Sequence, residues 1–150
     1  MIDLEKLCAD IEKLDPITYA KLIGEKGESV MKGITDVVGS HDDAVTLFSM
    51  LVFGAVNSDG KLDEKEFGLI KPLIEEAVEE EVDFEGATLF MEGIKSQKAE
   101  FNKMLISLSA MFGAISEELK TEIVTLCLLI CASDGKISKR EKNWIAKLVG

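Results

Sequence analysis

The residues best suited to chemistry in this chain belong to a phrase that occurs twice, at residues 58–66 and 133–141. Both copies begin with Ser-Asp-Gly-Lys and end in a glutamate, Glu66 in the first and Glu141 in the second. Each copy follows an apolar run and precedes an amphipathic segment. Because the same carboxylates recur in equivalent settings, the chemistry that the phrase suggests is the binding of a cation by oxygen ligands.

Helix capping alone explains part of the phrase. The glycine of each copy suits the left-handed conformation in which many helices end. In the second copy, Ser138 and Glu141 match the capping box, in which each side chain bonds to the backbone N–H of the other residue. Asp63 and Glu66 occupy the same positions in the first copy. The pattern therefore predicts that a helix starts after each glycine, with or without a ligand.

Capping does not explain Asp59 and Asp134. A carboxylate at the end of a helix faces the negative end of the helix dipole, which costs about 0.3–1 kcal/mol at an exposed site. A bound cation would offset this cost. So would Lys61 and Lys136, or a turn formed by the aspartate with nearby backbone N–H groups. These residues alone leave both explanations open, a cation ligand and turn chemistry.

The spacing differs from that of an EF-hand calcium loop. With Gly60 at the sixth position of such a loop, the first position falls on Ala55. In the second copy the first and third positions fall on Ile130 and Ala132, which offer no side-chain oxygen. An ordinary pair of EF-hands is therefore not expected.

Apolar residues recur every three to four positions through almost every segment, and no stretch alternates strictly between apolar and polar residues. This pattern predicts an all-α protein. The expected helices cover residues 2–14, residues 16–39 with a possible break at Gly24 or Gly27, residues 41–57, residues 84–91 and residues 98–115. Pro16 suits a first helical position, and Ser40 with Asp43 resembles a capping pair. Pro72 is expected to kink or break the helix after the first phrase.

Two segments, residues 41–57 and 123–132, are apolar on nearly every side. Such segments are typical of buried central helices, and we call them the hub helices. Each is followed by an amphipathic helix that should cover the core, through Phe67, Ile70, Leu73, Ile74 and Val78 in the first repeat and Trp144, Ile145, Leu148 and Val149 in the second. We therefore predict a compact single domain over residues 1–150, with about seven or eight helices and pseudo-symmetric helix-loop-helix repeats at about 41–79 and 117–149.

The composition and net charge of the chain make some classes of binding partner unfavourable. The chain has 150 residues, of which 47% are hydrophobic, and a net charge of −11 from 28 acidic and 17 basic residues. This charge disfavours nucleic acid and anionic membrane surfaces. No apolar run is long enough to span a bilayer, and the charged N-terminus does not resemble a secretory signal, so we expect a cytoplasmic protein. The odd number of cysteines fits a reducing compartment, and Cys127 and Cys131 are expected to lie in the core.

Other residues give little support to an enzyme. His41 is the only histidine and lies at an expected helix start without a nucleophile or a Glu-x-x-His pattern, so we expect it to be a surface residue. Residues 75–85 carry seven carboxylates, which are typical of a solvated helix face and turn. The same carboxylates also suit a docking surface for a basic protein.

The arrangement resembles the tellurite-resistance TerB-like family. Members of that family show an apolar helix, the motif Ala-x-x-Asp-Gly-x-Ile-x-x-x-Glu and an amphipathic helix, twice within an all-helical domain of about this length. Residues 55–66 and 131–141 carry the resemblance, although the alanine and its spacing differ between the copies. The resemblance implies a helical bundle with a metal-binding acidic surface, in proteins associated with tellurite resistance and stress response. It implies no settled catalytic activity.

Carried over by position, the resemblance implies that Asp59 and Asp134 are the chief metal ligands. Glu66 and Glu141 would lie beside them, and Asp63 would be supplementary. Oxygen ligands favour hard cations, so Ca²⁺ is the expected metal, with Mg²⁺ and Mn²⁺ as alternatives, and no organic cofactor is expected. The competing hypothesis is an acidic helical scaffold that docks a protein partner without any metal.

Overall fold

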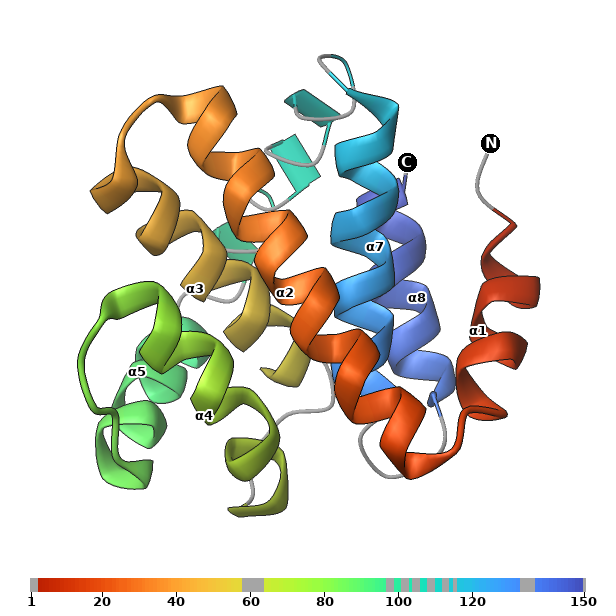
Figure 1. Ribbon diagram of the computed structural model, residues 1–150, viewed down its shortest axis with the longest axis horizontal. Coiled ribbons are helices and arrows are strands. Elements are labelled where there is room, and N and C mark those ends of the chain that lie inside the picture. Colours follow the sequence, from red (N-terminus) through yellow and green to blue (C-terminus); the bar gives the residue numbers. More distant parts are fainter. Residues whose placement is uncertain are drawn as a thin grey trace.

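The computed structural model describes residues 3–57, 64–96, 116–132 and 137–149, together with single residues or pairs between 99 and 114. The described residues form seven named helices and no strand, which confirms the all-α prediction. The helices are α1 (Leu4–Glu12), α2 (Pro16–Val38), α3 (His41–Asn57), α4 (Glu64–Val78), α5 (Phe84–Ser96), α7 (Glu117–Cys131) and α8 (Lys139–Val149) (Figure 1). The described residues between 99 and 114 are also helical.

Side-chain caps fix where several of these helices begin. Asp15 accepts a hydrogen bond of 2.8 Å from the Thr18 N–H, and Pro16 is the first residue of α2, as expected. The Thr18 N–H and hydroxyl, which both donate to the Asp15 carboxylate, lower the pKa of this group. Ser40 accepts from the Asp43 N–H at 3.4 Å at the start of α3. The sequence therefore placed both helix starts correctly.

The expected break in the second helix is wrong, because α2 runs without interruption from Pro16 to Val38. Two of its glycines, Gly27 and Gly33, lie against neighbouring helices. A Cβ atom on Gly27 would lie 2.4 Å from Leu73 Cδ2 of α4, and one on Gly33 would lie 2.4 Å from Leu119 Cδ1 of α7. The helix ends at Gly39, which has a φ of 75° and therefore adopts the left-handed conformation that glycine accepts without strain.

The α2 glycines give a first prediction. Gly24 has open space where a Cβ would be, so Gly24→Ala is expected to raise the free energy of unfolding by about 0.5–1 kcal/mol through helix propensity. Gly33→Ala gains the same propensity but must displace the Leu119 side chain, so its net effect should be smaller or destabilising. Urea denaturation of the two variants checks this order. A larger gain for Gly33→Ala than for Gly24→Ala would contradict the packing role of Gly33.

The second hub helix lies at the centre of the core. Every residue from Ile123 to Ala132 is buried, as predicted. The first hub helix, α3, is less uniform than predicted: its described buried residues are Ala44, Phe48, Leu51, Val52, Phe53, Gly54 and Ala55, whereas Val45, Leu47 and Met50 are only partly buried. The difference arises because α2 and α7 pack against α3, while its start lies at the edge of the molecule (Figure 1).

The helix after each hub covers the core through the expected stripe. In α4, Phe67, Ile70, Leu73 and Ile74 are buried, and in α8 Trp144 and Ile145 are buried. The remaining stripe side chains, Val78, Leu148 and Val149, lie outside the described side chains. Of the kink or break expected at Pro72, the break is wrong, because α4 continues through this exposed residue, while the kink stays a prediction. Similarly, α5 extends to Ser96, beyond its expected end at Met91.

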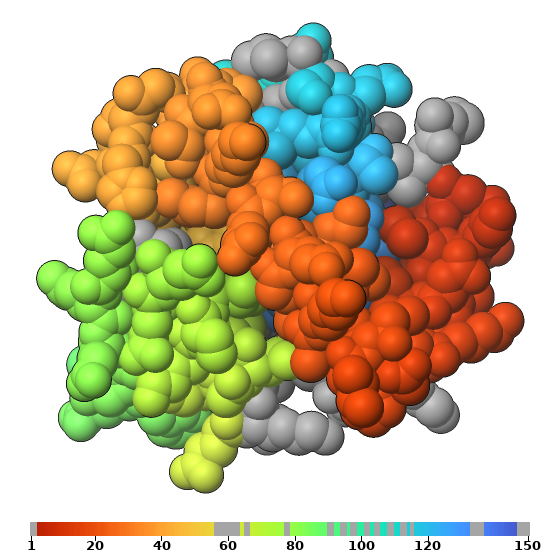
Figure 2. Space-filling model, viewed as in Figure 1, coloured from red at the N-terminus to blue at the C-terminus, as the bar shows by residue number. Residues whose placement is uncertain are grey.

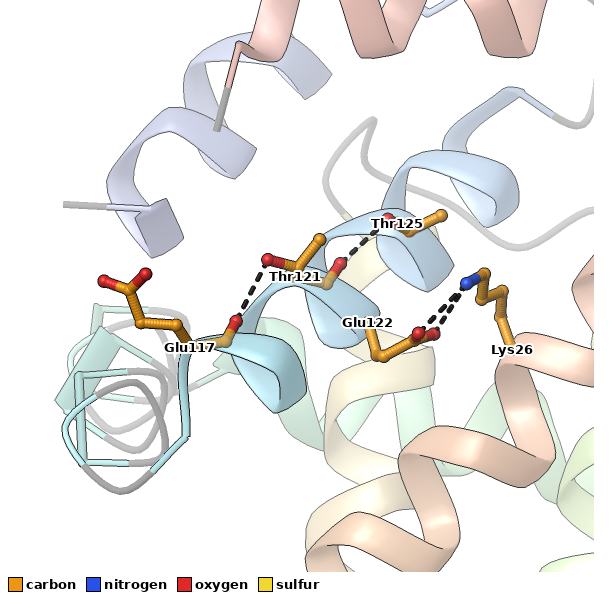
Figure 3. A network of polar contacts seen from close by, with 5 residues as sticks. All are labelled: Lys26, Glu117, Thr121, Glu122 and Thr125. Atoms are coloured by element: carbon orange, nitrogen blue, oxygen red, sulfur yellow. Dashed lines mark hydrogen bonds and ion pairs between the residues drawn. The ribbon is translucent and has the colours of Figure 1, made fainter. Parts of the chain in front are cut away.

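Polar contacts join α2 to α7 (Figure 3). Lys26 Nζ of α2 lies 3.1 Å from Glu122 Oε1 and 2.9 Å from Glu122 Oε2 of α7. Along α7, the Thr121 and Thr125 hydroxyls donate to the carbonyls of Glu117 and Thr121, one turn earlier (Figure 3). The ion pair links the two helices at the edge of the core. Among the described helices, none is long and apolar enough to cross a membrane.

Candidate functional site

Glu141 is the predicted ligand whose side chain the structure describes. The Ser138 N–H donates to Glu141 Oε1 at 2.8 Å, and the Glu141 N–H donates to Ser138 Oγ at 3.1 Å. This is the reciprocal pair of a capping box, at the first turn of α8. Glu141 is only 5% exposed. The capping interpretation of Glu141 is therefore confirmed, while its role as a metal ligand stays a prediction.

The other predicted ligands fall largely outside the described part of the structure. Asp59, Asp63 and Asp134 lie outside the described residues. The backbone of Glu66 belongs to the first turn of α4, but its side chain is also outside the described set. The complete ligand set therefore stays a prediction.

The ends of the two hub helices meet. The Cys131 thiol, on the last residue of α7, donates to the Ala55 carbonyl, two residues before the end of α3, with 3.6 Å between sulfur and oxygen. Figure 1 shows α3 and α7 neighbouring each other in the interior of the bundle. Asp59 and Asp134 follow these two residues by four and three positions in the sequence. The ends of the two helices that precede the phrases in the sequence therefore contact each other.

A carboxylate of the N-terminal helix α1 also contacts the second phrase. The Ile137 N–H donates to Glu12 Oε2 of α1 at 3.2 Å. The Tyr19 hydroxyl at the start of α2 donates to the Leu129 carbonyl in α7. Sequence reasoning missed both contacts, because no local pattern relates residues more than a hundred positions apart. They tie the N-terminal helices to the segment that carries the second phrase.

The cysteines lie in the core, as predicted for Cys127 and Cys131. Cys8, Cys127 and Cys131 are all buried and carry free thiols. Burial raises the pKa of Cys127 to about 12. Burial also raises the pKa of Cys8, although the positive charge of Lys142 partly opposes the shift. Because these shifts keep the thiols of Cys8 and Cys127 protonated near neutral pH, neither is an activated nucleophile or a ready soft-metal ligand.

The run of carboxylates at residues 75–85 forms a helix end, a turn and a helix start. Glu75 is half-buried and accepts from the Val82 N–H at 2.8 Å, and Asp83 Oδ1 accepts from the Gly86 N–H at 2.7 Å at the start of α5. Glu79 ends α4 with a φ of 60°. The remaining carboxylates are exposed, at Glu76, Glu79, Glu80, Glu81 and Glu85. The predicted solvated face and turn are therefore confirmed.

His41 is an exposed first residue of α3, as predicted. It lies on the rim of a cavity between α2, α3 and α4 that sequence reasoning did not find. Within the described side chains, no group of three or more histidines, cysteines or carboxylates is placed to hold a metal ion. A cation site with three such ligands would therefore have to include side chains outside the described set.

Comparisons of the chain with protein-family models, with curated proteins and with solved structures find no match.

Proposed function

We propose that this chain is a TerB-like helical protein that binds a hard divalent cation, Ca²⁺ before Mg²⁺ or Mn²⁺, through Asp59 and Asp134. The observation that carries the proposal is the contact between the Cys131 thiol and the Ala55 carbonyl. Because this contact joins the last turns of α3 and α7, it supports the proposal that carboxylates from both repeats contribute to one acidic site.

Coordination chemistry favours a shared site over two separate ones. Calcium takes six to eight oxygen ligands in proteins, and one copy of the phrase offers only two or three carboxylates. We infer that the two copies, which follow contacting helix ends, contribute Asp59, Asp134 and Asp63 to one cation site. A cation there would offset the unfavourable placement of an aspartate at the end of each hub helix.

In this proposal, the capping box and Glu12 hold the second phrase and the start of α8 in a fixed position. Glu141 holds the start of α8 through Ser138, and Glu12 holds the Ile137 N–H from α1. We infer that Glu66 takes the corresponding place at the start of α4, so that the two units α3-phrase-α4 and α7-phrase-α8 are pseudo-symmetric repeats. Glu66 and Glu141 are then secondary ligands, and Asp59 and Asp134 are primary ones. The function is binding rather than catalysis, in the cytoplasm and within a stress response such as that to tellurite.

Calorimetric titration with Ca²⁺ tests the proposal. Wild-type protein should release or absorb heat in a saturable way, and the double variant Asp59→Asn/Asp134→Asn should bind at least tenfold more weakly because it loses both primary charges. Asparagine keeps the size of the side chain and its turn-forming ability, so the fold should be unchanged.

The matched control is Glu80→Gln/Glu81→Gln, which removes the same charge from the exposed turn between α4 and α5. It should bind like wild type. Identical heats for wild type and the aspartate variant would refute the metal site. A loss of binding in the control alone would show that the cation binds at the acidic turn between α4 and α5 instead.

A second candidate function is supported by the exposed carboxylates of residues 75–85. They form an acidic surface that suits a basic protein partner, and this metal-free scaffold would need neither aspartate of the repeated phrase. Capture of a basic partner that weakens with salt, survives a chelator and fails with Glu80→Gln/Glu81→Gln would favour this function. Capture that depends on Ca²⁺ would favour the first.

A further inference from the structure

A groove between α2, α3 and α4 has the composition of a small-molecule site. It encloses about 320 Å³. Phe48 and Leu73 are buried and Met31 is half-buried, and these three side chains give it an apolar floor. In Figure 2, this is the region where the orange atoms of α2 meet the yellow-green atoms of α4. Cavities of this volume, with apolar walls and a few polar groups, are typical of ligand pockets.

The two helices α2 and α4, which form walls of the groove, pack closely at Gly27. A Cβ at this position would lie 2.4 Å from Leu73 Cδ2, so only glycine lets α4 approach α2 with Leu73 in its present position. Gly27 and Leu73 both line the groove. The floor of the groove therefore lies where α2 and α4 pack closely against each other. It is not a gap between loosely packed helices.

The rim of the groove carries a surplus of negative charge. Glu28 and Asp36 of α2 and Glu76 of α4 line it, against Lys32 as the cation. Glu28 and Asp36 each lie one helical turn from Lys32 and so offset its charge, while Glu76 faces the groove from the other wall. These three carboxylates are exposed, and within the described part of the chain their side chains make no hydrogen bond or ion pair.

We propose that this groove binds an amphipathic organic amine, with a compact apolar body on the floor and one ammonium group at the carboxylate rim. A cationic head matches the surplus of carboxylates, and the apolar body gains from burial against Phe48, Leu73 and Met31. A bare metal ion fits less well, because no group of three ligating side chains converges among the described residues. Among the described residues that line the groove, none belongs to either repeated phrase, and the proposal does not depend on a cation bound by the phrases.

The size of the groove favours a small ligand over a peptide helix. A helix that docks in a groove places several anchors along at least two turns. The apolar floor here is limited to three large side chains from three helices, which suits one ring or a short alkyl chain. The ligand class is therefore an aryl-alkyl or alkyl amine.

Titration of ¹⁵N-labelled protein with 4-phenylbutylamine, followed by amide chemical shifts, tests the proposal. Shifts are expected at residues 27–36, 41–48 and 73–76. 4-Phenylbutyrate and 4-phenylbutanol have the same apolar body with negative and neutral heads, and each should bind at least fivefold more weakly. Glu28→Gln/Glu76→Gln should weaken the amine about tenfold and change the alcohol less than twofold. Asp10→Asn, an exposed carboxylate on α1, should change neither.

Three outcomes would overturn the proposal. Equal affinities for 4-phenylbutylamine and 4-phenylbutyrate would show that the rim carboxylates do not select a cationic head group. Shifts confined to residues 75–85 would show nonspecific pairing with the acidic turn. Absence of shifts with the amine, together with shifts at residues 27–36 from a basic amphipathic peptide, would make the groove a protein-docking surface instead.

Discussion

Replacing Leu128 by alanine is expected to lower the free energy of unfolding by about 3 kcal/mol or more. Leu128 lies in the last turn of α7 with no exposed surface, and its neighbours from Ile123 to Ala132 are all buried. Close-packed neighbours relax only partly around the missing atoms, so the variant loses both the transfer free energy of the side chain and the contacts around the cavity. Urea denaturation followed by circular dichroism measures the loss.

The matched control is Leu89→Ala on α5, because Leu89 is 63% exposed. The same atoms are removed there from a position that water already reaches, so the change should stay within about 0.5 kcal/mol. Comparable losses for the two variants would contradict the placement of α7 as the central helix. A large loss at Leu128 with little at Leu89 would support it.

Glu141→Ala is expected to lower the free energy of unfolding by about 2 kcal/mol. The variant removes the acceptor of the Ser138 N–H in a nearly buried setting, and it opens space at the start of α8. Glu141→Gln keeps an acceptor oxygen and should lose about half as much or less. The transition can be followed by the fluorescence of Trp144, one turn further along the helix.

Glu117→Ala serves as the control for Glu141→Ala. Glu117 lies exposed in the first turn of α7, so the variant loses only an interaction with the helix dipole, about 0.3–1 kcal/mol. A loss at Glu141 no larger than the loss at Glu117 would contradict the capping box as a structural element. A loss that appears only when Ca²⁺ is present would instead identify Glu141 as a ligand without a capping contribution.

Local patterns in the sequence predict most of the helices. Asp15 and Pro16 place the start of α2, and the apolar run at residues 123–132 predicts the buried hub, since both depend on neighbouring residues alone. The glycines of α2 mislead for the opposite reason. Gly24 and Gly27 suggest a helix break, but Gly27 instead lies against Leu73, and this contact comes from a distant part of the chain.

The candidate site is predictable only in its residue types. The repeated phrase draws attention to Asp59 and Asp134, but its spacing at Ser138 and Glu141 suits a capping box as well as a ligand set, and the structure confirms the capping box. No pattern of neighbouring residues predicts the contacts of Cys131 with Ala55 and of Glu12 with Ile137. Each depends on how the helices pack, which is why the meeting of the two hub ends was not foreseen.

Paramagnetic broadening by Mn²⁺ tests the central claim most directly. With substoichiometric Mn²⁺ and ¹⁵N-labelled protein, the amides of residues 57–66 and 132–141 should broaden together and first, because one cation lies between the two phrases. Excess Ca²⁺ should restore the signals. Broadening that starts at residues 75–85, or that spreads evenly over exposed carboxylates without competition by Ca²⁺, would contradict a metal site at Asp59 and Asp134.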